Sequence, residues 1–111
     1  MIYSDTCNFN NQELISKNNI NLILRPDISD WSVHVIMGIV TIPDLKLAIF
    51  NKIDDYSLIE IGLFNFMCKK ILVTAKSALN YPALMKTVDY FDLSCNLDND
   101  NPSFIEWYKT C

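Results

Sequence analysis

The sequence predicts a single small α/β domain, a doubly wound parallel sheet of about four to five strands with helices on both faces, of the flavodoxin or Rossmann-like type. Short apolar runs alternate with segments of helical character, in the order βαβαβαβ. The apolar runs are continuous, which is typical of strands buried on both faces. The chain has 111 residues and is 50% hydrophobic, enough for one core, so we expect residues 1–111 to form one domain.

The N-terminal part predicts a strand, a helix and a second strand. Residues 1–4 can form a short strand. Residues 10–17 suit a short helix that Asn18 and Asn19 end, because Asn tolerates the left-handed conformation found at helix ends. The apolar run over 20–24, closed by Arg25 and Pro26, is typical of a buried strand.

The middle of the chain predicts two helices around a third strand. A capping residue at Ser29 or Asp30 begins a helix that ends before Pro43, although its many β-branched residues leave a strand as the alternative. The apolar run over 45–50 predicts the third strand, and residues 57–68 predict the next helix.

The remaining elements are shorter. We expect Cys68 to be buried at the end of its helix, and residues 71–74 to form the fourth strand. Residues 81–88 suit a helix opened by a proline, 98–102 a polar turn, and 103–108 a short terminal helix.

Composition narrows the function classes. The formal net charge is −4, and the lysines are scattered or paired rather than gathered in a stripe, so a nucleic-acid polymer is not an expected partner. No run of 18 apolar residues suggests a membrane-spanning helix, and no signal peptide is visible, so we expect a cytoplasmic protein without membrane contact. The four cysteines form no C-x-x-C pair, which argues for reduced thiols rather than a zinc site.

The stretch D-D-Y-S-L-I-E-I-G, from Asp54 to Gly62, is the main functional signal. It follows the third predicted strand, and ligands of open α/β sheets bind at the carboxyl ends of the strands. Glu60 is a lone carboxylate in a mostly apolar helix. Such a group is either an ordinary solvent-facing residue or a half-buried one with a raised pKa that is available for chemistry.

The segment from Asp44 to Thr74 resembles the core of the nucleoside 2-deoxyribosyltransferase family and its nucleotide N-glycosidase relatives. That family carries a strand, a motif of the form D-x-G-T-x-x-E-x-G, an apolar helix and a further strand. Asp54, Ser57, Glu60 and Gly62 stand at the Asp, Thr, Glu and second Gly positions, while Tyr56 replaces the first glycine. Met1-Ile2-Tyr3 resembles the opening strand, and Pro82 to Met85 resembles the segment after the last strand.

The resemblance implies a division of roles. Glu60 would stabilise or trap the sugar cation as a nucleophile, Asp54 would bind a sugar hydroxyl or handle the base proton, and Tyr3 would orient Glu60. We expect no cofactor and no metal. The residues expected to bind substrate are Ser57, Asp55, Asp30, Trp31 and Phe64, the last two by stacking on a base.

Each assignment has a plainer alternative. Asp54 and Asp55 can simply begin a helix, which favours acids in its first turn, and Ser57 can be its N-cap. His34, among apolar neighbours, suits the edge of the core better than a catalytic base. Tyr3 is also an ordinary strand aromatic.

Three functions remain open. The first is an enzyme that cleaves or transfers the N-glycosidic bond of a nucleoside or nucleotide. The second is a non-catalytic protein that captures a nucleotide-derived small molecule. The third is a TIR-like domain that processes NAD. In each case we expect a homo-oligomer, because small domains of this kind bury some of their aromatic residues between subunits.

Overall fold

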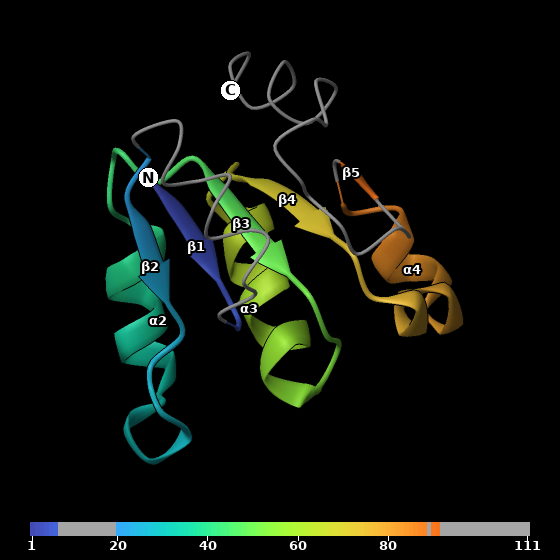
Figure 1. Cartoon of the computed structure of the whole chain (residues 1–111), viewed down its shortest axis with the longest axis horizontal. Coiled ribbons are helices and arrows are strands. Elements are labelled where there is room, and N and C mark those ends of the chain that lie inside the picture. Colours follow the sequence, from blue (N-terminus) through green and yellow to red (C-terminus); the bar gives the residue numbers. More distant parts are fainter. Residues whose placement is uncertain (7–19, 89, 92–111) are drawn as a thin grey trace.

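Five parallel strands form one sheet in the order β2-β1-β3-β4-β5 (Figure 1). The computed structural model describes residues 1–6, 20–88 and 90–91. The strands are β1 (Ile2–Ser4), β2 (Leu22–Leu24), β3 (Leu47–Phe50), β4 (Lys70–Val73) and β5 (Tyr90–Phe91). This confirms the predicted small doubly wound α/β fold. The sequence did not predict β5. The helices predicted over 10–17 and 103–108, and the turn over 98–102, lie outside the described residues.

Two α-helices lie side by side on the same face of the sheet (Figure 1). They are α2 (Val33–Val40) and α3 (Asp55–Phe66). A short helix, α4 (Pro82–Met85), and two 3-10 helices, η1 (Ile28–Asp30) and η2 (Lys76–Asn80), complete the described elements. None of the helices in this described part of the chain has the length and apolar character that crossing a membrane requires.

Helix α2 begins later than predicted. Its N-cap is Ser32, whose hydroxyl accepts a hydrogen bond from the backbone N–H of Val35 at 3.2 Å, while Asp30 belongs to η1. The helix prevails over the β-branched alternative because Ile36 and Val40, one turn apart, are both fully buried. His34 is exposed on this helix, not at the edge of the core as expected.

Helix α3 is capped at both ends. Its N-cap is Asp54, not Ser57: the Asp54 carboxylate accepts a hydrogen bond from the backbone N–H of Ser57 at 2.8 Å. At the C-terminal end, Cys68 has a φ of 58°, and the N–H groups of Cys68 and Lys69 bond the carbonyls of Asn65 and Phe64. This is a Schellman motif, and it leaves Cys68 exposed rather than buried as predicted.

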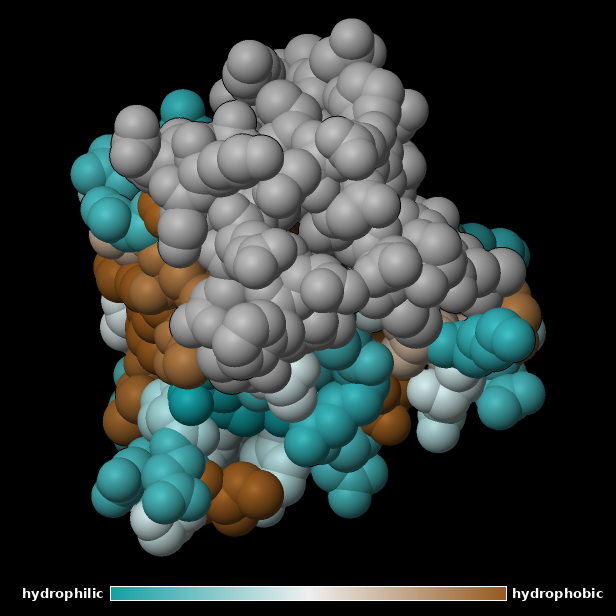
Figure 2. All heavy atoms as spheres, viewed as in Figure 1, coloured by the Kyte–Doolittle hydropathy of each residue, from teal (hydrophilic) through white to brown (hydrophobic). Residues whose placement is uncertain are grey.

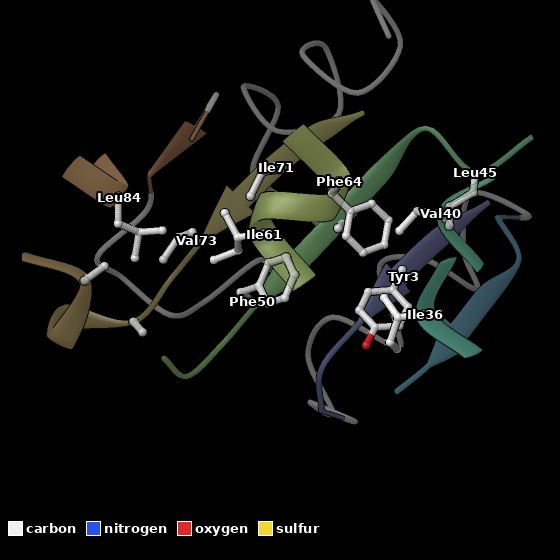
Figure 3. Close-up of a cluster of buried hydrophobic side chains, with 13 residues drawn as sticks. Tyr3, Ile36, Val40, Leu45, Phe50, Ile61, Phe64, Ile71, Val73 and Leu84 are labelled. Carbon is white, nitrogen blue, oxygen red and sulfur yellow. The ribbon is translucent and has the colours of Figure 1, made fainter. Parts of the chain in front are cut away.

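The core lies between the sheet and α2 and α3. All residues of β1 and β3 are buried, as the continuous apolar runs predicted. The rings of Tyr3, Phe50 and Phe64 pack together at centroid distances of 5.1 to 6.2 Å. Figure 3 shows the Tyr3 ring within this cluster. The packing of the Tyr3 ring therefore places its hydroxyl on the side of the sheet that α3 covers.

Candidate active site

The carboxylate of Glu60 lies at the centre of a buried polar cluster. Glu60 is 0% exposed and projects from the sheet-facing side of α3. Its Oε1 accepts a hydrogen bond from the hydroxyl of Tyr3 on β1, and its Oε2 accepts one from Trp31 Nε1 at 3.0 Å. Glu60 is therefore fully buried, neither solvent-facing nor only half-buried as the two sequence alternatives had it, and two neutral donors fix its orientation.

Arg25 supplies the positive charge of the cluster. It follows β2, and its backbone N–H bonds the carbonyl of Ser4, so β2 and β1 place it beside the end of β1. Its Nε lies 2.7 Å from Glu60 Oε2, an ion pair between side chains that are 6% and 0% exposed. The Nε–H itself makes no aligned hydrogen bond. The contact is thus an ion pair without an aligned hydrogen bond from Nε.

The other end of the same guanidinium reaches the start of α3. Arg25 Nη2 donates a hydrogen bond to Ser57 Oγ at 3.2 Å, and Nη1 lies 3.5 Å from Asp54 Oδ2. Lys52 Nζ also approaches Asp54 Oδ2, at 3.7 Å. The Ser57 hydroxyl lies 2.9 Å from both the Lys52 carbonyl and Asp54 Oδ1. One arginine therefore joins the two carboxylates of the motif.

Burial and charge shift the pKa values of this cluster in different directions. Burial raises the pKa of Glu60, and the hydrogen bonds from Tyr3 and Trp31 and the charge of Arg25 oppose that rise without cancelling it. Burial also raises the pKa of Tyr3, and Glu60 raises it further, so the hydroxyl stays a donor. For Asp54, burial is outweighed by the hydrogen bonds from Ser57 and by nearby cations, and its pKa is lowered.

An aromatic pair lies next to Glu60. The rings of Trp31 and Tyr56 meet edge to face, with centroids 4.9 Å apart. Tyr56, which stands at the first glycine position of the motif that this segment resembles, packs against the indole whose N–H holds Glu60. The pair thus gives the cluster an aromatic side.

The structure brings together five of the residues expected from the sequence: Tyr3, Trp31, Asp54, Ser57 and Glu60. The hydrogen bond expected between Tyr3 and Glu60 is present. Asp30 and Asp55 are exposed on η1 and at the first residue of α3, and neither takes part in the described network around Glu60.

Phe64 requires a correction. It was expected to stack on a base, but it is 0% exposed and packs against Tyr3 and Phe50. Phe64 follows Glu60 by one helical turn on the same face of α3, and that face is turned into the core. Its ring therefore packs against Tyr3 within the core and cannot contact a ligand.

Arg25 is the functional candidate that sequence reasoning missed. Arg25-Pro26 was interpreted only as the end of a strand. The available signal was its position: a cation directly after a buried strand lies at the carboxyl edge of the sheet, where ligands bind. Its contacts with α3 depend on β2 pairing with β1, which the sequence did not establish.

A second polar cluster lies at the carboxyl ends of β1, β3 and β4. The Asp5 carboxylate, 7% exposed, accepts hydrogen bonds from the backbone N–H groups of Asn51 (3.0 Å) and Lys52 (3.1 Å). The Asn51 side chain also donates to Ser4 Oγ and accepts from the Thr74 hydroxyl. These contacts join three neighbouring strand ends and hold the loop that carries Lys52 and leads into Asp54.

Within residues 1–6, 20–88 and 90–91, no group of three or more His, Cys, Asp or Glu side chains is arranged to hold a metal ion. Comparisons with protein-family models, with curated proteins and with solved structures found no match to this chain. What this chain can do is therefore inferred from its Asp54–Gly62 motif and from the geometry around Glu60.

Proposed function

We propose that this protein cleaves or transfers the N-glycosidic bond of a nucleoside or nucleotide, with Glu60 as the carboxylate that faces the anomeric carbon. The observation that carries the proposal is the state of Glu60: a buried carboxylate oriented by Tyr3 and Trp31 beside the carboxyl edge of a parallel sheet. Orientation of this kind is what stabilisation of a developing positive charge requires.

The chemistry follows from the charges that develop. As the bond between C1′ and the base nitrogen breaks, its electron pair leaves with the base, which takes up a proton from solvent water, and C1′ becomes cationic. Glu60 would stabilise that cation or bond to it covalently, and water or a second base would then attack C1′. Tyr3 holds Oε1, while Trp31 and Arg25 hold Oε2, so Oε2 becomes the candidate for attack when Arg25 moves away.

Asp54 fits one of its two expected roles better than the other. Its lowered pKa keeps the carboxylate ionised, so it is a poor source of a proton for the departing base. An ionised carboxylate is a good acceptor for a sugar hydroxyl. We therefore assign Asp54 to sugar binding, next to the position of the Ser57 hydroxyl.

Arg25 has to move in this mechanism. Its guanidinium lies 2.7 Å from Glu60 Oε2 and 3.5 Å from Asp54 Oδ2, the space that a sugar ring between the two carboxylates would need. A cation in that position also resembles, in charge, the sugar cation that the site would stabilise. We infer that substrate displaces the guanidinium, which frees Glu60 to act.

The test is base release from a panel of deoxynucleosides, ribonucleosides, deoxynucleoside 5′-monophosphates and NAD, followed by chromatography. We expect one substrate class to yield free base over time. Glu60→Gln, which keeps the shape but loses the charge, should lower the rate about 10³-fold. Asp44→Asn removes an exposed acid far from the cluster and should leave the rate unchanged. Turnover that persists in Glu60→Gln would remove Glu60 from the reaction.

A specific observation supports a second candidate, the non-catalytic capture of a nucleotide-derived molecule. Every acceptor atom of Glu60 is engaged and the side chain is 0% exposed, as in a structural ion pair. The same panel separates the two functions when the protein is heated after incubation. An intact molecule that appears only in the heat-released fraction would support capture and contradict catalysis.

A further inference from the structure

Helices α2 and α3 expose apolar residues on the side turned away from the sheet. On α3, Ile59 is 44% exposed and Phe66 is 78% exposed, with Gly62 between them on the same face. On α2, Val35 is 41% exposed and Gly38 follows it on the outward side. We call these five residues the α2–α3 face. Figure 2 shows hydrophobic residues at the edge of the molecule where β2 lies in front of α2 in Figure 1, and the outward side of the two helices is turned away in this view.

The glycines of this face are not required by a single copy of the chain. The sequence has two glycines, and both lie inside these helices at exposed positions. A Cβ added at Gly38 or Gly62 would meet nothing within 4 Å, and neither glycine has a positive φ. A glycine inside a helix costs about 1 kcal/mol relative to alanine. A second backbone that approaches closely from outside would account for both.

The charges around the face allow two copies to meet. The chain carries a net charge of −4, so copies repel one another in most orientations. Helix α2 contains no Asp, Glu, Lys or Arg, and the charged residues of α3 are Asp55 at its first position and the buried Glu60. The α2–α3 face is therefore neutral, with Asp55 at its rim, and it can oppose its own copy without like-charge repulsion.

We propose that the α2–α3 face binds a second copy of this chain in a two-fold symmetric dimer. In such a dimer α3 packs against the partner's α3, and Gly62 leaves room for the Phe66 ring of the other copy. Both helices keep their inner sides on the sheet, so the cluster around Glu60 stays outside the contact.

The size of the face sets the expected affinity. Helix α3 has 12 residues and is about 18 Å long, and two adjacent helices are about 20 Å wide. The flat area is on the order of 400 Å² per copy, or about 800 Å² in total, which is below the standard size and in the range of weak, transient contacts. We therefore expect a dissociation constant in the micromolar range, about 10 μM.

Sedimentation velocity of the full chain between about 1 and 200 μM tests the proposal across that range. The wild type should shift from monomer to dimer, and Phe66→Lys should remain monomeric while its circular dichroism spectrum is unchanged. Leu79→Lys changes a residue that is 56% exposed on η2, outside the face, and should dimerise as the wild type does. A wild type that is monomeric at every concentration, or a Phe66→Lys variant that dimerises normally, would overturn the proposal.

Gly62→Ala is an independent test, because it should stabilise the monomer and weaken the dimer. In a single copy the added methyl group enters open space and improves helix propensity, so thermal stability measured at monomeric concentration should rise. In the dimer the same methyl group lies between the two α3 helices, so the dissociation constant should rise about tenfold. An increase in stability with no loss of dimer would show that α3 does not form the contact.

Discussion

The guanidinium of Arg25 lies 2.7 Å from the carboxylate of Glu60, and both side chains are almost completely removed from solvent. The pair joins the residue after β2 to α3, and α2 and β3 separate the two in the chain. A buried ion pair stabilises little relative to apolar residues of the same shape, but the loss of one partner leaves a buried charge without compensation. The two residues should therefore be strongly coupled.

The coupling predicts a specific pattern in a double-mutant cycle. Arg25→Met and Glu60→Gln should each lower the free energy of unfolding by about 3 kcal/mol. The double variant should lose about 1–2 kcal/mol less than the sum of the two single losses, because neither charge is then left buried without its partner. Urea unfolding at pH 7 measures this. Lys86→Met, at an exposed lysine, serves as control and should change stability by less than about 0.5 kcal/mol. Additive losses would contradict the coupling.

Asp54 should make stability fall in acid. Its folded pKa is lowered, so its contribution is complete above the unfolded value near 3.9 and is lost as the pH falls through the folded pKa. Asp54→Asn keeps an N-cap acceptor for Ser57 but has no charge, so its urea midpoint should depend less on pH below about pH 4 than that of the wild type. Asp54→Ala should lose about 1 kcal/mol more at every pH, because it also removes the cap.

The contribution of Glu60 to stability should change with pH in the opposite direction to that of Asp54. Its folded pKa is raised, so its contribution is complete below the unfolded value near 4.3 and is lost as the pH rises through the folded pKa. Glu60→Gln removes this dependence, and the stability of the variant relative to the wild type should therefore improve with rising pH above about 4.3. Urea midpoints of both proteins between about pH 4 and pH 7 measure it. A difference that stays constant over this range would mean that the Glu60 pKa is not raised.

The fold could be predicted because it depends on local patterns. Continuous apolar runs identified β1 to β4, and the acidic start of α3 was visible as D-D. The strand β5 was missed because two residues give no periodicity. Within the site, the pairing of Tyr3 with Glu60 came from the resemblance of the opening strand and of the Asp54–Gly62 motif to one family. Arg25 was missed because its role depends on long-range contacts across the sheet.

The burial of Phe64 follows from the face of α3 on which it lies. Ser57, Glu60, Ile61 and Phe64 share one face of α3, and all four are buried. The spacing of these residues was visible in the sequence, so an apolar Phe64 turned inward also implied that Glu60 is turned inward. Considered one residue at a time, each seemed free to face a ligand. Taken as one helix face, they specify a buried carboxylate.

Asp5 should matter for stability through the loop that it holds. Its carboxylate is the acceptor for backbone N–H groups of Asn51 and Lys52. Asp5→Ala removes that acceptor and should lower the free energy of unfolding by about 2–4 kcal/mol, whereas Asp5→Asn keeps one acceptor oxygen and should lose less. Asp44→Ala, at an exposed acid, is the matched control. Equal stability of Asp5→Ala and the control, measured by urea unfolding, would contradict this role.

The C-terminal end of α3 should be improved by a glycine. Cys68 adopts a φ of 58° to close the Schellman motif, a conformation that is unfavourable for a residue with a Cβ and free for glycine. Cys68→Gly should therefore raise the free energy of unfolding by about 0.5–1 kcal/mol, which thermal unfolding under reducing conditions measures. Cys68→Ala removes the thiol but keeps the Cβ, so it should show no gain. If Ala stabilised the protein as much as Gly, the benefit would come from the loss of an exposed thiol, and the backbone conformation would not be the cause.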